Sequence, residues 1–162
     1  MKDFNKITIN CNWKTTKYNE QIIDFWQRLN ALPDGVNPFH RVEETVFVAT
    51  NSDGEVIGVT TAVPKQIAHL NQLWFFNFRT MMHPEFRIPG LVDYLASETI
   101  NLLEQDYLQG KSECVGVITL IEDQRVQKIK RKAVYTATGL TFVGYTKNKA
   151  EIRLKYFKGA TI

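Results

Sequence analysis

The sequence predicts an α/β (α+β) fold with a mixed, largely antiparallel sheet of about seven strands flanked by helices. Segments with strand and helix patterns follow one another as strand, helix, three strands, helix, strand, helix, two strands. Two strand–helix–strand connections interrupt the hairpins, and such crossovers bring parallel neighbours into a sheet. The run at residues 114–121 is almost wholly apolar, which is typical of a strand buried on both faces.

The first elements are an edge strand and an amphipathic helix. Ile7, Ile9 and Cys11 alternate with polar residues, so we expect a strand with one buried face. Apolar residues then recur at helical spacing over residues 18–32, and the sequence Pro-Asp-Gly at 33–35 ends this helix. An irregular stretch with a short helical piece follows.

Three strands come next. Residues 46–49 and 55–63 are rich in β-formers, and the turn chemistry at 51–54 predicts a hairpin between them. Residues 73–82 form a further strand that is dense in aromatic side chains. The dipeptide at 83–84 ends it, because proline donates no ladder hydrogen bond and holds the preceding residue extended.

The second half predicts two helices and three strands. Residues 90–108 have helical spacing, residues 114–121 form the buried strand, and residues 123–137 are expected to form a basic helix stopped by a glycine. A last strand pair is predicted at 141–146 and 150–157.

Composition excludes several classes of protein. The chain has 162 residues, of which 44% are hydrophobic, enough for one domain over residues 1–162 without disulfides or metal. Cys11 and Cys114 form no framework, and the three histidines have no metal-ligand spacing. No signal peptide or membrane helix is expected, so the protein is predicted to be cytoplasmic. The sequence does not decide between a monomer and a homodimer.

The most informative stretch is the turn at residues 82–92, where a strand ends and a long helix begins. The first amides of a helix lack internal partners and carry partial positive charge, so such an end binds phosphate readily. Gly90 allows close approach of a ligand, Arg87 adds a cation, and Pro89 fixes the turn. A plain strand-to-helix connection explains the same residues on generic grounds.

This stretch resembles the acyl-CoA-binding segment of the GNAT N-acetyltransferase superfamily. That family has a strand ending in valine-x-proline, then an arginine or glutamine, then x-x-glycine-x-glycine or alanine opening a helix. The order of elements is also similar over the whole chain. The resemblance implies an N-acyltransferase that uses acetyl-CoA or another acyl-CoA. It implies that the cofactor binds at Met82, Arg87, Ile88, Pro89, Gly90, Leu91 and Val92, with its carbonyl and pantetheine at the strand amides near Met82 and its pyrophosphate at the turn around Arg87 and Gly90.

A second segment, residues 133–140, resembles the later GNAT segment in which a helix carries a tyrosine four residues before a glycine. Tyr135 stands at that position and, by the resemblance, protonates the departing CoA thiolate. A phenol, with an ordinary pKa near ~10, is protonated at neutral pH. A tyrosine that merely packs under the last strands is the competing interpretation.

The chain departs from the family pattern at two positions. Val92 stands where the second small residue is expected, and Asp93 follows it. A carboxylate there suits the helix dipole but repels a pyrophosphate that it faces. The alternative to an enzyme is therefore an inactive GNAT-fold binding or accessory module.

No general base stands out. Glu122 and Asp123 follow the buried strand, and His83 lies close to the turn, so each could relay a proton through water. The acceptor is expected to be a small-molecule or protein amine. The basic helix lacks the aromatic interleaving of RNA-binding surfaces, so nucleic acid is not an expected partner.

Overall fold

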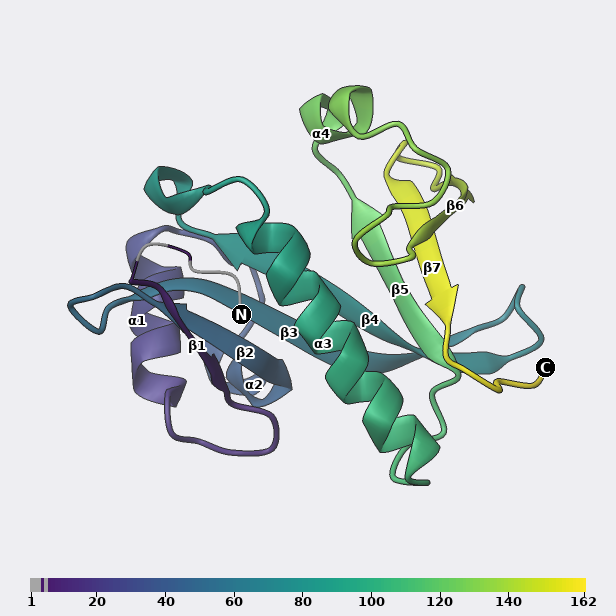
Figure 1. Ribbon diagram of the computed structural model, residues 1–162, viewed down its shortest axis with the longest axis horizontal. Coiled ribbons are helices and arrows are strands. Elements are labelled where there is room, and N and C mark those ends of the chain that lie inside the picture. The colour runs from purple at the N-terminus through teal and green to yellow at the C-terminus, as the bar shows by residue number, and fades with distance from the viewer. Residues whose placement is uncertain (1–3, 5) are drawn as a thin grey trace. The chain divides into compact units, whose positions relative to one another are not determined.

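The computed structural model describes residue 4 and residues 6–162. Seven strands form one sheet in the order β1-β2-β3-β4-β5-β7-β6 (Figure 1). The pairs β1–β2, β2–β3, β5–β7 and β6–β7 are antiparallel, whereas β4 and β5 are parallel. The predicted mixed, largely antiparallel sheet is therefore confirmed.

The strands are β1 (Thr8–Cys11), β2 (Thr45–Thr50), β3 (Val56–Ile67), β4 (Leu73–Met82), β5 (Gly116–Ile121), β6 (Thr141–Tyr145) and β7 (Glu151–Tyr156). The helices are α1 (Asn19–Arg28), α2 (Pro38–Arg41), α3 (Leu91–Leu108) and α4 (Gln124–Ile129), with short 3-10 turns η1 (Val42–Glu44) and η2 (Pro84–Phe86). The predicted order of elements is correct.

The chain divides into two compact units. One comprises Met1–Ala62 with Thr80–Thr99, and the other comprises Val63–Arg79 with Ile100–Ile162. The first unit holds the predicted phosphate turn, and the second holds Tyr135. The expectation of one domain over residues 1–162 stays a prediction.

In the first unit, apolar side chains pack on both faces of the sheet. On one face, α1 buries Ile22, Phe25 and Trp26 against Val48 of β2 and Val59 of β3. The other face carries the β4-end cluster, which comprises the buried residues Phe4, Ala49, Ile57, Met82, Leu91 and Leu95. This cluster fixes the start of α3 against the end of β4.

A bulge in β2 is stabilised by a buried hydroxyl. The β2–β3 register shifts between Thr45 and Val48. The amide of Phe47, within that shift, donates to Oγ1 of Thr60 at 3.1 Å. Oγ1 of Thr99 in α3 lies 2.8 Å from the same hydroxyl, so a buried polar pair links β3 to α3 within this unit.

In the second unit, β5 and β7 form the centre. One face buries Phe75, Val115, Ile118 and Leu154, against which Tyr107 of α3 packs. The first half of the apolar run 114–121 is buried as predicted, but Leu120 is 39% exposed. The prediction of burial on both faces is therefore correct only for the start of β5.

Four sequence expectations need correction. The helix expected over residues 18–32 ends at Arg28, before the Pro-Asp-Gly at 33–35. Residues 123–137 do not form one helix: α4 ends at Ile129, and Lys130 leaves the helical region with φ −93° and ψ 83°. The strand expected to end at residue 63 continues through Pro64 to Ile67. Cys11 is exposed, so the buried face of the first strand is limited to Ile7 and Ile9, which pack on the β4-end cluster.

Tyr135 consequently lies in a loop rather than on a helix. The backbone there has other partners: the amide of Phe142 donates to the carbonyl of Ala133, and Val134 forms a bridge with Thr141. Non-local pairing with β6 outcompetes the local helical pattern on which the prediction depended.

Candidate functional site

The end of β4 is set by a glycine in the neighbouring strand. Met82 is 5% exposed, and a Cβ at Gly58 would lie 2.7 Å from its Cε and 2.9 Å from its Sδ. The amide of His83 donates to the carbonyl of Ile57 at 2.7 Å. Gly58 was not predicted from the sequence, although a glycine inside a strand is the ordinary signal of such a close approach.

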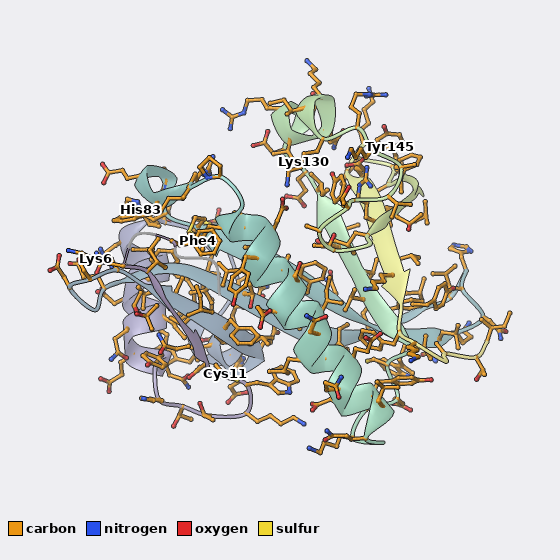
Figure 2. The ribbon with its side chains drawn as sticks, viewed as in Figure 1. Phe4, Lys6, Cys11, His83, Lys130 and Tyr145 are labelled. Atoms are coloured by element: carbon orange, nitrogen blue, oxygen red, sulfur yellow. The ribbon has the colours of Figure 1, made fainter. Side chains whose placement is uncertain are left out.

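The short turn η2 begins with a histidine cap. Nδ1 of His83 accepts a hydrogen bond from the amide of Glu85 at 3.1 Å, and the His83 ring meets Phe86 edge-on. Figure 2 shows His83 beside this turn. The amide of Ile88 then donates to the carbonyl of Phe86, while Arg87 has φ −76° and ψ 65°. Arg87 is thus the centre of an inverse γ-turn.

The next turn leads directly into α3. The amide of Leu91 donates to the carbonyl of Ile88 at 3.1 Å, and Gly90 has φ +82°. Pro89 and Gly90 occupy the central positions of a type II turn, whose third residue needs φ of about +80°. The amide of Tyr94 donates to the carbonyl of Gly90 at 2.9 Å, which is the first helical bond of α3.

This geometry leaves room and positive charge at the helix start. A Cβ at Gly90 would meet nothing within 4 Å. Arg87 is exposed, and within the described part of the chain its side chain makes no ion pair or hydrogen bond. Since α3 runs for 18 residues, its first turn carries the partial positive charge of a long helix. The turn can hold an anion such as a pyrophosphate.

The two departures from the family pattern have different surroundings. The side chain of Val92 is half-buried and packs on the β4-end cluster together with Ile88 and Phe86. Asp93 is half-buried in the first turn of α3, where a carboxylate suits the dipole.

In the second unit, Tyr135 lies half-buried in the loop between α4 and β6. Its amide donates to the carbonyl of Leu140, and its carbonyl accepts from the amide of Gly139 at 2.8 Å. Its phenolic hydroxyl donates to the carbonyl of Lys130 at 3.4 Å. The loop from Lys130 to Leu140 thus closes on itself around the tyrosine.

A buried arginine lies beneath this loop. Arg153 is 1% exposed, and its Cζ lies 3.7 Å from the centre of the Tyr135 ring. Its Nη1 donates to the carbonyls of Ala133 at 3.1 Å and Leu140 at 3.3 Å, and its Nη2 pairs with Oε1 of Glu151 at 3.1 Å. Neither Arg153 nor Glu151 was predicted as a site residue from the sequence, because a charge in a strand pattern gives no sign of burial.

The candidate bases are mostly engaged elsewhere. Asp123 caps α4 by accepting from the amide of Arg125 at 2.9 Å and also pairs with that guanidinium. The hydrogen bond with the Arg125 side chain lowers the pKa of Asp123, which makes it a poor proton acceptor. His83 is engaged by its cap, and Glu122 is exposed.

Cys114 is an inert thiol rather than a nucleophile. Burial raises its pKa to about 11, and only the thiolate is reactive. In the described residues, no group of three histidine, cysteine or acidic side chains could hold a metal. Within the same residues, no helix is both long and apolar enough to cross a bilayer.

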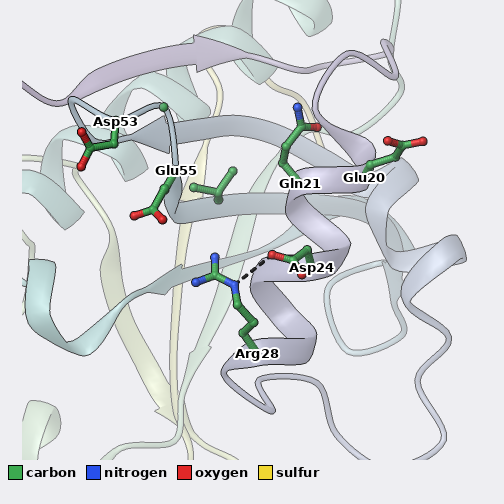
Figure 3. Close-up of a pocket in the computed structure, with 8 residues that line it drawn as sticks. Glu20, Gln21, Asp24, Arg28, Asp53 and Glu55 are labelled. Carbon is green, nitrogen blue, oxygen red and sulfur yellow. Dashed lines mark hydrogen bonds and ion pairs between the residues drawn. The ribbon is translucent and has the colours of Figure 1, made fainter.

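A separate hollow of about 570 Å³ lies beside α1 in the first unit (Figure 3). Its walls carry Glu20, Asp24, Asp53 and Glu55, and Arg28 pairs with Asp24 at 2.9 Å. None of the residues implied by the family resemblance lines it.

The structure groups seven of the eight predicted site residues in one segment. Met82 and residues 87–92 lie together in the first unit, from the last residue of β4 to the first turn of α3. Tyr135 belongs to the second unit, where its ring stacks on the Arg153 guanidinium.

No protein-family model and no curated protein matches the chain. Solved structures do. NAA60 of Arabidopsis thaliana, in complex with acetyl-CoA, superposes with a TM-score of 0.62 and 14% identity, over 94% of this chain and 99% of that chain. The ribosomal-protein-S5-alanine acetyltransferase of Vibrio fischeri superposes with a TM-score of 0.61 and 11% identity, over 99% of this chain and 98% of that chain.

A GNAT superfamily phosphinothricin acetyltransferase of Sinorhizobium meliloti, in complex with acetyl-CoA, gives a TM-score of 0.60 and 13% identity, over 96% of this chain and 91% of that chain. Such identities show a shared fold. The element order, the sheet and these likenesses agree: the chain has the fold of the GNAT acetyltransferases.

Proposed function

We propose that the protein is an N-acyltransferase that transfers an acetyl group from acetyl-CoA to an amine. The observation that carries the proposal is the start of α3, where the type II turn at Pro89–Gly90 leaves open space beside an exposed Arg87. Two of the three similar structures described above are complexes with acetyl-CoA.

The turn fits the pyrophosphate of CoA. Arg87 offers a planar, permanently charged group that can bind phosphate oxygens in a bidentate manner. The glycine at 90 lets the ligand approach the backbone, and the amides at the start of α3 supply donors without intrahelical acceptors. Val92 packs on the β4-end cluster, so its bulk need not enter this space.

Acetyl-CoA supplies an activated thioester, whose carbonyl carbon a neutral amine attacks. We assign Tyr135 as the general acid that donates its phenolic proton as the sulfur departs. The acylated nitrogen loses one proton to solvent, and the phenolate of Tyr135 regains one from solvent. Because Asp123 and His83 are engaged in caps, we assign Glu122 or water to remove the proton from the ammonium form of the acceptor.

The acceptor class stays broad. Among the similar structures, one acts on the alanine of ribosomal protein S5 and another on phosphinothricin, so this fold serves both protein and small-molecule amines. We propose an amine acceptor and leave both kinds in the screen.

Calorimetry with acetyl-CoA tests the role of the turn in binding the cosubstrate. We expect Arg87→Ala to raise the Kd about tenfold or more, because a charge-assisted hydrogen bond contributes roughly 1.5–3 kcal/mol. Arg28→Ala is the matched control, since it removes the same charge from an exposed arginine of α1. Equal effects of the two variants would show that Arg87 has no specific role.

The release of CoA thiol tests the chemistry. Acetyl-CoA is offered with lysine, spermidine and short peptides that have free N-termini, and Tyr135→Phe is expected to lower kcat about 100-fold while the Kd for acetyl-CoA holds. No binding of acetyl-CoA at millimolar concentration would favour the inactive binding or accessory module instead.

A further inference from the structure

The loop that carries Tyr135 is built around Arg153. Strand residues alternate between the two faces of a sheet, so Ile152 and Leu154 of β7 face the apolar cluster of the second unit, and Glu151 and Arg153 face the other way. That opposite face is covered by the loop from Lys130 to Leu140, through the contacts of the Arg153 guanidinium.

The guanidinium engages this loop in two ways, through hydrogen bonds from Nη1 and through the stacking of its plane on the Tyr135 ring. Nη1 binds the carbonyls of Ala133 and Leu140, which precede and follow the tyrosine in sequence. Cζ of the Arg153 guanidinium lies 3.7 Å from the centre of the Tyr135 ring, within the range of a cation–π contact. The Tyr135 ring and two carbonyls of its loop are therefore held by one buried side chain.

Glu151 holds the arginine in turn. The two residues are separated by one position on β7, are 5% and 1% exposed, and pair at 3.1 Å. A charge is rarely buried unless it is paired, and a buried pair constrains geometry more than it stabilises the fold. Oε2 of Glu151 and Nε of Arg153 have no hydrogen-bond partner among the described residues.

We propose that Arg153, held by Glu151, is a positioning residue that sets the orientation of the Tyr135 phenol for proton donation. The inference rests on the proposed function, because it gives Arg153 a role only through the general acid. Arg153 does not itself touch the reacting atoms in this mechanism. It fixes the ring and binds the carbonyls of Ala133 and Leu140 in the same loop, so that the phenol is oriented before the substrate binds.

Two variants test the inference without leaving a lone buried charge. Arg153→Lys keeps the charge but loses the planar stacking and the double carbonyl contact, and the pair Glu151→Gln with Arg153→Met removes both charges together. The exposed pair Glu113→Gln with Lys111→Met is the matched control. Thermal unfolding shows whether each variant folds.

Kinetics give the first readout, as thiol release from acetyl-CoA with the same set of amines. Both Arg153 variants are expected to lower kcat about 10- to 100-fold and to keep the Kd for acetyl-CoA within about twofold, since displacement of a catalytic group by an ångström has effects of this size. In a Tyr135→Phe background the same changes are expected to lower kcat less than about twofold. An equal loss in both backgrounds would overturn the proposal.

The second readout needs no activity. With 3-fluorotyrosine placed at Tyr135, the fluorine resonance is expected to be single and sharp in the parent and shifted or broadened in both Arg153 variants, but not in the control. An unchanged resonance overturns the positioning role. Wild-type kcat in Tyr135→Phe would instead overturn the general acid of the proposed function, so the two failures are distinguishable.

Discussion

The turn at residues 83–91 and the loop at residues 130–140 both connect a regular element to the next, but they are held in different ways. In the turn, the hydrogen bonds beyond the His83 amide, which pairs with Ile57 of β3, join residues at most three positions apart, from the His83 cap to the Leu91 amide. In the loop, the decisive contacts come from Arg153, which is 18 positions beyond Tyr135.

This difference indicates two ways to prepare a functional group. The turn is shaped by proline and glycine and leaves Arg87 exposed and adaptable, which suits the capture of a flexible, charged ligand. The loop is locked onto a buried cation, which suits a group that must act with one orientation. The proposed pyrophosphate-binding turn is thus adaptable, and the proposed general acid is held in one orientation, as their tasks require.

The largest effect expected from this comparison is on stability. Arg153→Ala removes one partner of a buried pair and leaves Glu151 without compensation, so we expect the free energy of unfolding to fall by about 3–5 kcal/mol. Arg87→Ala, at an exposed position, should change it by less than about 0.5 kcal/mol. Urea unfolding measures both. Similar values for the two variants would remove the distinction between the segments.

The two glycines sharpen the comparison further. Gly90 and Gly139 have φ of +82° and +75°, so alanine should cost about 1–2 kcal/mol at either site. The functional consequences should differ. A Cβ at Gly90 enters open space beside Arg87 and is expected to weaken acetyl-CoA binding. Gly139 donates to the Tyr135 carbonyl, so its replacement is expected to lower kcat. Calorimetry and thiol release separate these effects.

The same contrast explains what could be read from the sequence. The turn was predictable because its signals are local: Pro84 stops β4, and Pro89–Gly90 specifies a type II turn before the helix. The bounds of β4 were predicted correctly for the same reason. The long α3 followed from its apolar spacing.

The loop was not predictable from local pattern. Residues 123–137 have helical spacing, yet the helix ends at Ile129 because Ala133 and Val134 pair with β6 and the Arg153 guanidinium binds the loop. No residue near Tyr135 in the sequence indicates that Arg153 of β7 will contact its ring. Gly58 was missed because its reason is the Met82 side chain, which is brought against it only by the fold.

Val92 offers a smaller test of the open turn. Its side chain is half-buried on the β4-end cluster, so Val92→Ala should cost about 1 kcal/mol of stability through lost apolar burial. The Kd for acetyl-CoA should stay within about twofold. A clear gain in affinity would show that the valine crowds the pyrophosphate, and would place the departure from the family pattern in the binding site rather than in the core.

The smallest expected effect concerns the entry to the loop. Asp123 caps α4, and its pairing with Arg125 lowers its pKa below the ordinary value of 3.8 in the folded protein. A lowered folded pKa means that ionised Asp123 stabilises the fold above pH 3.8 and that this contribution is lost as pH falls through the folded pKa. Asp123→Asn keeps a cap but has no charge. The parent should therefore melt at a higher temperature than this variant at pH 7, and the difference should disappear below pH 3.8. A difference that persists at low pH would assign the stabilisation to the cap alone.

Because α4 only leads into the loop, kcat of Asp123→Asn at pH 7 should stay near the parent value, in contrast to the variants of Arg153.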